Sequence, residues 1–156
     1  MIETEEPLPQ RTQRSTEELG SKDESVATVG INSITQAIIG AAMKVHSQLG
    51  PGLLENAYKA CVAHELRKSG FHVQTEVDLP LVYDGVQIEL GYRIDLIVND
   101  CVIVELKCVE RFSSVHDAQI IHYLRLSKKH VGLLINFHVR HLKDGIKRFV
   151  EGPASD

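Results

Sequence analysis

The stretch IDLIVNDCVIVELK, residues 94–107, decides the fold because it places two apolar runs on either side of Asn-Asp-Cys. Apolar runs of this length around a turn sequence predict two antiparallel strands. A two-residue loop would mix charged and apolar side chains on both faces of the pair. A three-residue loop leaves one face wholly apolar, and a slip of one residue would destroy that separation. We therefore predict the pairs Val98–Val102, Leu96–Val104 and Ile94–Leu106.

The opposite face of this predicted hairpin carries three charges. In the three-residue register Asp95 lies directly opposite Glu105, and Lys107 projects from the same face. Opposed carboxylates have Cβ atoms about 5 Å apart and repel unless a positive charge lies between them. A divalent cation of the Mg²⁺ type, bound by hard oxygen ligands, would hold the pair at neutral pH. The alternative is a salt-bridged trio on a solvent-facing strand.

The sequence on either side of the hairpin predicts an α/β domain. Apolar residues recur first at helical spacing and then with a period of two, and the later run VGLLINF is apolar throughout, as in a strand covered on both faces. Ser114 and Asp117 have the spacing of a capping box. The expected helices are 33–48, 52–69 and 114–129, and the expected strands are 73–79, a hairpin around 83–85, 92–98, 102–107, 131–137 and 146–150.

Length and composition fit one folded domain with polar ends. The chain has 156 residues, of which 43% are hydrophobic. Residues 1–28 are polar and aperiodic, which indicates a disordered tail, residues 29–150 would form the domain, and 151–156 a flexible C-terminus. No apolar run approaches the roughly 20 residues that cross a bilayer, and the acidic N-terminus lacks signal-peptide features. We expect a cytoplasmic protein without a membrane partner.

The net charge of −4 is distributed unevenly along the chain. The first 28 residues hold seven acids and three bases, whereas residues 101–150 hold four acids and nine bases. This basic part could contact a nucleic-acid backbone in a sequence-neutral way, and a solvated basic face is the alternative. The candidate contact residues are Arg125, Lys128, Lys129, Arg140, Lys143, Lys147 and Arg148.

Two of the predicted helices carry polar side chains at informative positions. Glu55 shares a helix face with the apolar residues Tyr58, Val62 and Leu66, so its carboxylate lies in an apolar stripe. On the later helix Gln119 and Tyr123 are four residues apart and therefore lie one turn from each other. An ordinary amphipathic boundary is the alternative for this second pair.

Five segments in order resemble a known family. GLLENAY (52–58) matches the GxxExxY signature of a family of small bacterial and archaeal proteins, and YRIDLIV, VELK, HDAQIIHYLR and VGLLINF follow in the order typical of it. That family belongs to the PD-(D/E)xK nuclease superfamily, and QIIHY also fits the QxxxY element of its RecB-like branch. The resemblance covers residues 33 to 150. It implies a restriction-endonuclease-like core, a mixed β-sheet flanked by helices.

The resemblance also implies roles for residues at matching positions. Asp95 and Glu105 would bind a divalent metal, Mg²⁺ or Mn²⁺, and Lys107 would position the attacking water and stabilise charge on the phosphate. Glu55 would be the helix-borne acid that binds metal directly or through water. Gln119 and Tyr123 would hold DNA or support the metal ligands. The catalytic residues that the resemblance implies are therefore Asp95, Glu105, Lys107, Glu55, Gln119 and Tyr123.

Two positions qualify the resemblance. Ile94 stands where the proline that gives the superfamily its name would be. His46 matches a helix histidine that binds metal in RecB-like nucleases, and a histidine packed or hydrogen-bonded near a helix end is the alternative. A second metal ion between Glu55 and Asp95 is left open.

The resulting expectation is a prokaryotic, metal-dependent deoxyribonuclease that cuts phosphodiester bonds through an Asp/Glu/Lys site. A noncatalytic nucleic-acid-binding or assembly module on the same fold is the first alternative, because fold does not establish function. An interaction protein, whose first two helices contact a protein partner or a second copy, is the other. A structure should place the carboxylates of Asp95 and Glu105 together, with Lys107 on the same side and Glu55 facing them.

Overall fold

The computed structural model describes residues 30–89 and 91–152. The predicted N-terminal tail and most of the predicted C-terminal segment lie outside the described residues. Within the described ranges, no helix combines the length and apolar character needed to cross a membrane.

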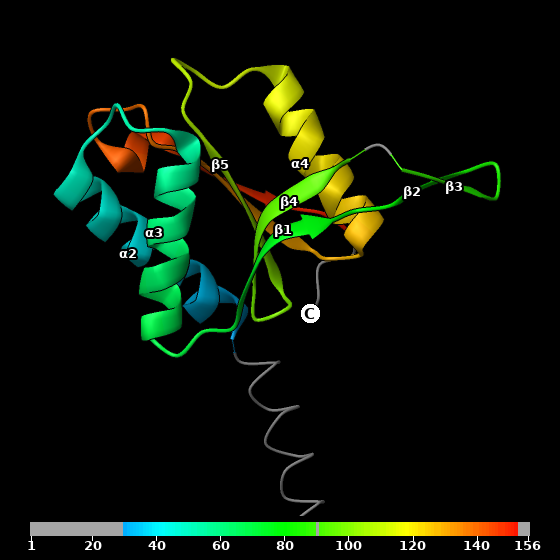
Figure 1. Cartoon of the computed structure of the whole chain (residues 1–156), viewed down its shortest axis with the longest axis horizontal. Coiled ribbons are helices and arrows are strands. Elements are labelled where there is room, and N and C mark those ends of the chain that lie inside the picture. The colour runs from blue at the N-terminus through cyan, green and yellow to red at the C-terminus, as the bar shows by residue number, and fades with distance from the viewer. Residues whose placement is uncertain (1–29, 90, 153–156) are drawn as a thin grey trace, which may run out of the picture.

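A mixed five-stranded sheet forms the centre of the domain, in the order β1-β4-β5-β6-β7 (Figure 1). The pair β5–β6 is parallel and the other neighbours are antiparallel. Every residue of β6 is buried, as predicted for a strand covered on both faces. The predicted α/β class and the last predicted strand are confirmed. The strands are β1 Val73–Asp78, β4 Arg93–Val98, β5 Val102–Lys107, β6 Val131–Asn136 and β7 Ile146–Val150.

The β4–β5 hairpin has the predicted three-residue loop. Asn99 and Asp100 adopt positive φ angles of 50° and 54°, a region that Asn and Asp tolerate better than most residues. The predicted pairs Val98–Val102 and Leu96–Val104 are confirmed. The predicted pair Ile94–Leu106 is wrong, because the ladder ends at Leu96 and side chains take over the hydrogen bonds beyond it.

Helices cover both faces of the sheet (Figure 1). Helices α2 (Ile31–Leu49) and α3 (Glu55–Lys68) lie against one face and bury the larger apolar cluster, which includes Leu96 and Val104. Helix α4 (Ser114–Ser127) lies on the other side, where Tyr123 and Leu124 pack with residues of β4 and β5. The 3₁₀ helix η1 (Leu142–Gly145) precedes β7.

Two local features refine the sequence-based expectations. The capping box of α4 joins Ser113 and His116, one residue before the predicted Ser114 and Asp117. The correction reflects where the chain turns into the helix, since Ser113 retains an extended backbone. The predicted hairpin around 83–85 is confirmed as a separate two-stranded arm, β2 (Leu81–Tyr83) and β3 (Val86–Ile88), which projects from the body of the domain (Figure 1).

Candidate active site

Asp95 and Glu105 meet at the open end of the β4–β5 hairpin, beyond the last ladder pair. The backbone N–H of Asp95 donates to Oε1 of Glu105 at 2.9 Å, and the N–H of Leu106 donates to Oδ2 of Asp95 at 2.9 Å. Both acids are buried, with 7% and 3% of their surfaces exposed. The structure therefore brings the two predicted metal ligands together and fixes each carboxylate by a backbone hydrogen bond from the other strand.

Burial of this pair changes the acidity of Glu105. Its pKa is raised to about 8, first because burial penalises its charged form and then because of the negative charge of Asp95. The hydrogen bond from the Asp95 backbone and the charge of Lys107 act in the opposite direction. In metal-free protein Glu105 therefore retains a proton at neutral pH. A hard divalent cation fits this donor set, because it would favour the ionised form of both buried carboxylates.

Glu55 lies at the first position of α3 and is half-buried. Burial raises its pKa most, the charge of Asp95 raises it further, and the charges of Lys107 and Lys59 lower it. Asp95 and Lys107 lie on the β4–β5 hairpin, so Glu55 belongs to the same cluster of charged residues as the acid pair. The other residues of its predicted apolar stripe, Tyr58, Val62 and Leu66, are buried.

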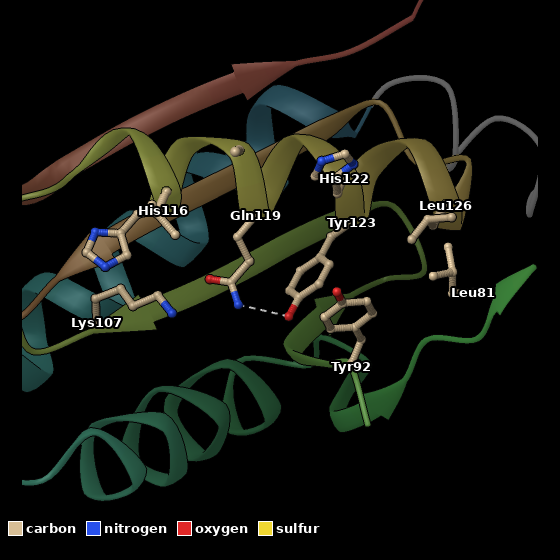
Figure 2. A pocket seen from close by; sticks show the side chains of 10 residues that line it. Leu81, Tyr92, Lys107, His116, Gln119, His122, Tyr123 and Leu126 are labelled. Atoms are coloured by element: carbon tan, nitrogen blue, oxygen red, sulfur yellow. Dashed lines mark hydrogen bonds between the residues drawn. The ribbon is translucent and has the colours of Figure 1, made fainter. Parts of the chain in front are cut away.

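Lys107 lines one end of a cavity of about 590 Å³ between α4 and the base of the projecting arm. Figure 2 shows its side chain extending toward Gln119, which donates a hydrogen bond from Nε2 to Oη of Tyr123 at 3.0 Å. The ring of Tyr92 meets that of Tyr123 edge-on at 6.2 Å. Burial raises the pKa of Tyr123, so its hydroxyl keeps its proton at neutral pH. Lys107, Gln119 and Tyr123 thus border one mainly apolar groove.

Lys59 and Glu76 join this cluster without having been identified from the sequence. Lys59 lies one helical turn after Glu55, only 7% exposed, with its Nζ 3.0 Å from Oδ1 of Asp95 and in an ion pair with Glu76. Glu76 has a φ of 52°, which is uncommon for a non-glycine residue. The spacing of four residues from Glu55 is the one signal that could have identified Lys59, because it places both on one helix face.

The acid pair has no third ligand at binding distance among the described residues. In the described ranges, no group of three or more His, Cys, Asp or Glu side chains is close enough to hold an ion. His46 is buried near Phe137, and its Nε2 is 2.8 Å from the carbonyl oxygen of Val139. These contacts match the hydrogen-bonded alternative for His46. Its predicted role as a metal ligand stays a prediction and gains no contact in its favour.

The predicted basic residues divide into paired and unpaired groups. Exposed ion pairs engage three of them: Arg125 with Glu151 at 2.7 Å, Lys129 with Asp100 at 2.9 Å, and Lys147 with Asp117 at 2.6 Å. Their charges are therefore partly neutralised within the protein itself.

The remaining basic residues have other surroundings. Arg148 donates a hydrogen bond to Asn32 at 3.2 Å, and Lys128 adopts a left-handed conformation at the end of α4. Arg140 and Lys143 line a second cavity, of about 340 Å³, together with His46. Neither makes an ion pair within the part of the chain that the structure describes. The structure thus distributes the basic residues over several places instead of one continuous face.

The chain matches a family model over most of its length. The family model described as the PD-(D/E)XK nuclease superfamily matches residues 32–149, which span the sheet and the three helices around it except for the end residues Ile31 and Val150. No curated protein and no solved structure matches the chain. The match covers the acid pair, Lys107 and the α4 residues, and it does not distinguish the GxxExxY family from other members.

Proposed function

The chain belongs to the PD-(D/E)XK nuclease superfamily, and on that premise we propose that it hydrolyses DNA phosphodiester bonds with the help of Mg²⁺ or Mn²⁺. Members of this superfamily are generally hydrolytic nucleases that use divalent metals. The observation that carries the proposal is the pair of buried carboxylates on Asp95 and Glu105, held together at the open end of the hairpin beside Lys107.

Each residue of the cluster has a chemical task in this proposal. Asp95 and Glu105 would hold the ion, and a divalent ion bound there lowers the pKa of water and offsets negative charge on the phosphoryl oxygens. Lys107 contributes a fixed positive charge beside the scissile phosphate and orients the attacking water. Glu55, at the edge of the cluster, would accept a hydrogen bond from that water.

The groove beside Lys107 would accept the part of the nucleic acid next to the scissile phosphate. Its tyrosine and aliphatic side chains offer apolar contact, and the side chains of Gln119, His116 and His122 add hydrogen-bonding groups. Gln119 and Tyr123 hold the substrate in this proposal, and their mutual hydrogen bond fixes the orientation of both. Arg140, Lys143 and Lys128 make no ion pair within the described part of the chain, so they are the candidates for contacts with the nucleic-acid backbone.

One observation favours the second candidate, a noncatalytic nucleic-acid-binding module. The ammonium of Lys59 already contacts Asp95 at 3.0 Å, so part of the negative charge of the cluster is balanced without metal. If that balance is complete, the fold would bind nucleic acid and leave it intact.

Cleavage assays separate these candidates. Linear, circular and single-stranded DNA are incubated with wild type, Asp95→Asn or Lys107→Met in Mg²⁺, Mn²⁺ or EDTA. Asp78→Asn is the matched control, because this aspartate lies on β1, is exposed and pairs with Arg93, which is also exposed. We expect metal-dependent cleavage by wild type and the control, and none by the two site variants. Intact DNA that is nevertheless retained by wild type would establish the binding module instead.

A further inference from the structure

The environment of Lys59 is unusual for a lysine. Its side chain extends from α3 toward the sheet, and 7% of the residue is exposed. Lysines are rarely buried unless their charge is paired. The contacts of Lys59 therefore indicate what its charge does in this protein.

Three oxygen atoms surround the ammonium of Lys59. Nζ lies 3.0 Å from Oδ1 of Asp95 and 3.3 Å from Oδ1 of Asn56, and it also donates to Oε1 of Glu76. An ammonium has three donors and no acceptor, so the number of surrounding oxygens matches the number of its donors. Lys59 is consequently a fixed cation inside the acid cluster and not a flexible surface charge.

The backbone of β1 is shaped around the same cation. The β1–β4 register would place Glu76 opposite Asp95, but this pair is missing from the ladder between Thr75–Leu96 and Val77–Ile94. At that point Glu76 adopts its positive φ of 52°. An unfavourable conformation that persists at a site is a reason to seek a function for it. Here it accompanies the contact between the Glu76 carboxylate and Lys59.

Charge balance connects Lys59 with the metal of the proposed function. The cluster comprises four carboxylates, Glu55, Glu76, Asp95 and Glu105, and two ammonium groups, Lys59 and Lys107. When all are ionised, two negative charges remain, which one divalent ion balances. Oδ1 of Asp95 is shared with Lys59, so a second ion at that oxygen would lie close to the ammonium and be repelled by it.

We propose that Lys59 occupies the place of one divalent cation, so that the cluster excludes a second ion and binds a single ion between Asp95 and Glu105. This inference rests on the proposed function and adds the number of metal ions to it. Lys59 is a positioning residue in this sense: it acts on the charge and orientation of Asp95, and it does not touch the substrate.

Counting bound Mn²⁺ tests the inference without any cleavage assay. The EPR signal of free Mn²⁺ is titrated with purified full-length protein, which gives the number of ions bound per chain. Wild type should bind one ion. Lys59→Met, which keeps the length of the side chain and removes its charge, should bind two. Lys59→Arg retains the positive charge and should bind one.

A matched control excludes a general effect of removing a lysine. Lys44→Met breaks another lysine–carboxylate pair, that of Lys44 with Glu65 at 2.9 Å, which is exposed and does not include the acid pair. This variant should bind one ion, as wild type does. If Lys59→Met does not fold, the count in wild type and in Lys59→Arg still decides, because two ions in either protein would overturn the inference.

The other outcomes distinguish this inference from the proposed function. One ion in both wild type and Lys59→Met would overturn the role of Lys59 and leave the metal-dependent nuclease intact. No ion in wild type and one in Lys59→Met would overturn this inference, which requires one ion in wild type, and metal-dependent cleavage with it. No ion in either protein would overturn both.

Discussion

The two halves of the β4–β5 hairpin are held together in different ways. Near the turn, Val98–Val102 and Leu96–Val104 are ordinary ladder pairs between buried residues. Beyond Leu96, the carboxylates of Asp95 and Glu105 accept the backbone hydrogen bonds instead. The same two strands thus provide a closed half that stabilises the fold and an open half that gathers charge. Side chains of the open half are structural acceptors as well as candidate ligands.

This division implies that stability and activity should respond to different substitutions. In the closed half, apolar burial favours folding and no buried charge opposes it. In the open half, the two buried carboxylates repel each other. Their negative charge is balanced by Lys59, Lys107 and, in our proposal, a metal ion. Substitutions there should affect cleavage most, and some of them should increase stability in metal-free protein.

The largest effect is expected for Glu105→Gln in the open half. Glutamine preserves an oxygen that can accept the Asp95 N–H, so the strands should remain together. It cannot provide the anionic ligand, and cleavage should fall by about 10³-fold or more, or about 4 kcal/mol. Initial rates in Mg²⁺ measure this. Glu110→Gln, at an exposed position shortly after β5, is the control. Cleavage by Glu105→Gln at the rate of wild type would refute the assignment of Glu105.

The pH dependence of stability should reveal the free-energy cost of ionising the buried Glu105 carboxyl in metal-free protein. The pKa of Glu105 is about 8 in the folded state and 4.5 ordinarily. Between these values the folded state keeps a proton that the unfolded state releases, so stability should decline as pH rises from about 5 to 8. The decline should reach about 4 kcal/mol. Urea unfolding in EDTA at several pH values, compared between wild type and Glu105→Gln, measures it.

Glu105→Gln is the control for this pH dependence. Because Glu105→Gln cannot titrate, its stability should lack this decline and exceed that of wild type at pH 8 in EDTA. Added Mn²⁺ should restore wild type more than the variant, since a bound ion favours the ionised carboxylate. Equal pH dependence in the two proteins would contradict the raised pKa.

Leu96→Ala probes the closed half. Leu96 is fully buried in the larger apolar cluster, and truncating a buried leucine leaves a cavity that costs about 3 kcal/mol. Urea unfolding measures this loss. The number of Mn²⁺ ions bound by the folded variant should stay the same, because Leu96 lies on the ladder side of the acid pair. A lost ion would show that the two halves are not separable.

The closed half could be predicted from the sequence because its apolar residues follow a regular pattern on either side of the turn. Alternating apolar residues around Asn99 and Asp100 determined the loop length and two of the three pairs. The third pair, Ile94–Leu106, failed because pattern reasoning assumes that backbone groups bond to each other, whereas here carboxylates replace them. The position of the α4 cap was missed by one residue for a similar local reason, since Ser113 and Ser114 are equivalent in composition.

The open half was predictable only in part. Register and resemblance together placed Asp95 and Glu105 side by side. Lys59 was overlooked because a lysine on a helix normally projects into water, and its burial depends on Glu76, far away in sequence. The positive φ of Glu76 has no sequence signature, as glutamate rarely adopts it. Partners brought together by tertiary structure are therefore what sequence reasoning lacks.

Tyr123→Phe tests how far the open half extends toward α4. Phenylalanine keeps the ring and removes the hydroxyl that accepts the hydrogen bond from Gln119, which should cost about 1 kcal/mol of stability. Cleavage should decrease about tenfold at low substrate concentration, because Gln119 loses its fixed orientation. Tyr83→Phe, at a tyrosine 70% exposed on the projecting arm, is the control. Equal kcat/KM for both variants would limit the site to the hairpin.

The smallest effects are expected where charges are exposed. Lys147→Met breaks its ion pair with Asp117 and should change stability by less than about 1 kcal/mol. Lys143 makes no ion pair in the described part of the chain, so it can release a counterion when it binds a phosphate. Lys143→Met should therefore reduce the salt slope of DNA binding by about 1, and Lys147→Met by less. Filter binding in EDTA at several salt concentrations measures both slopes. Equal slopes for the two variants would mean that an ion pair within the protein does not decide which lysines contact the DNA backbone. The difference between paired and unpaired charges would then matter only in the β4–β5 hairpin.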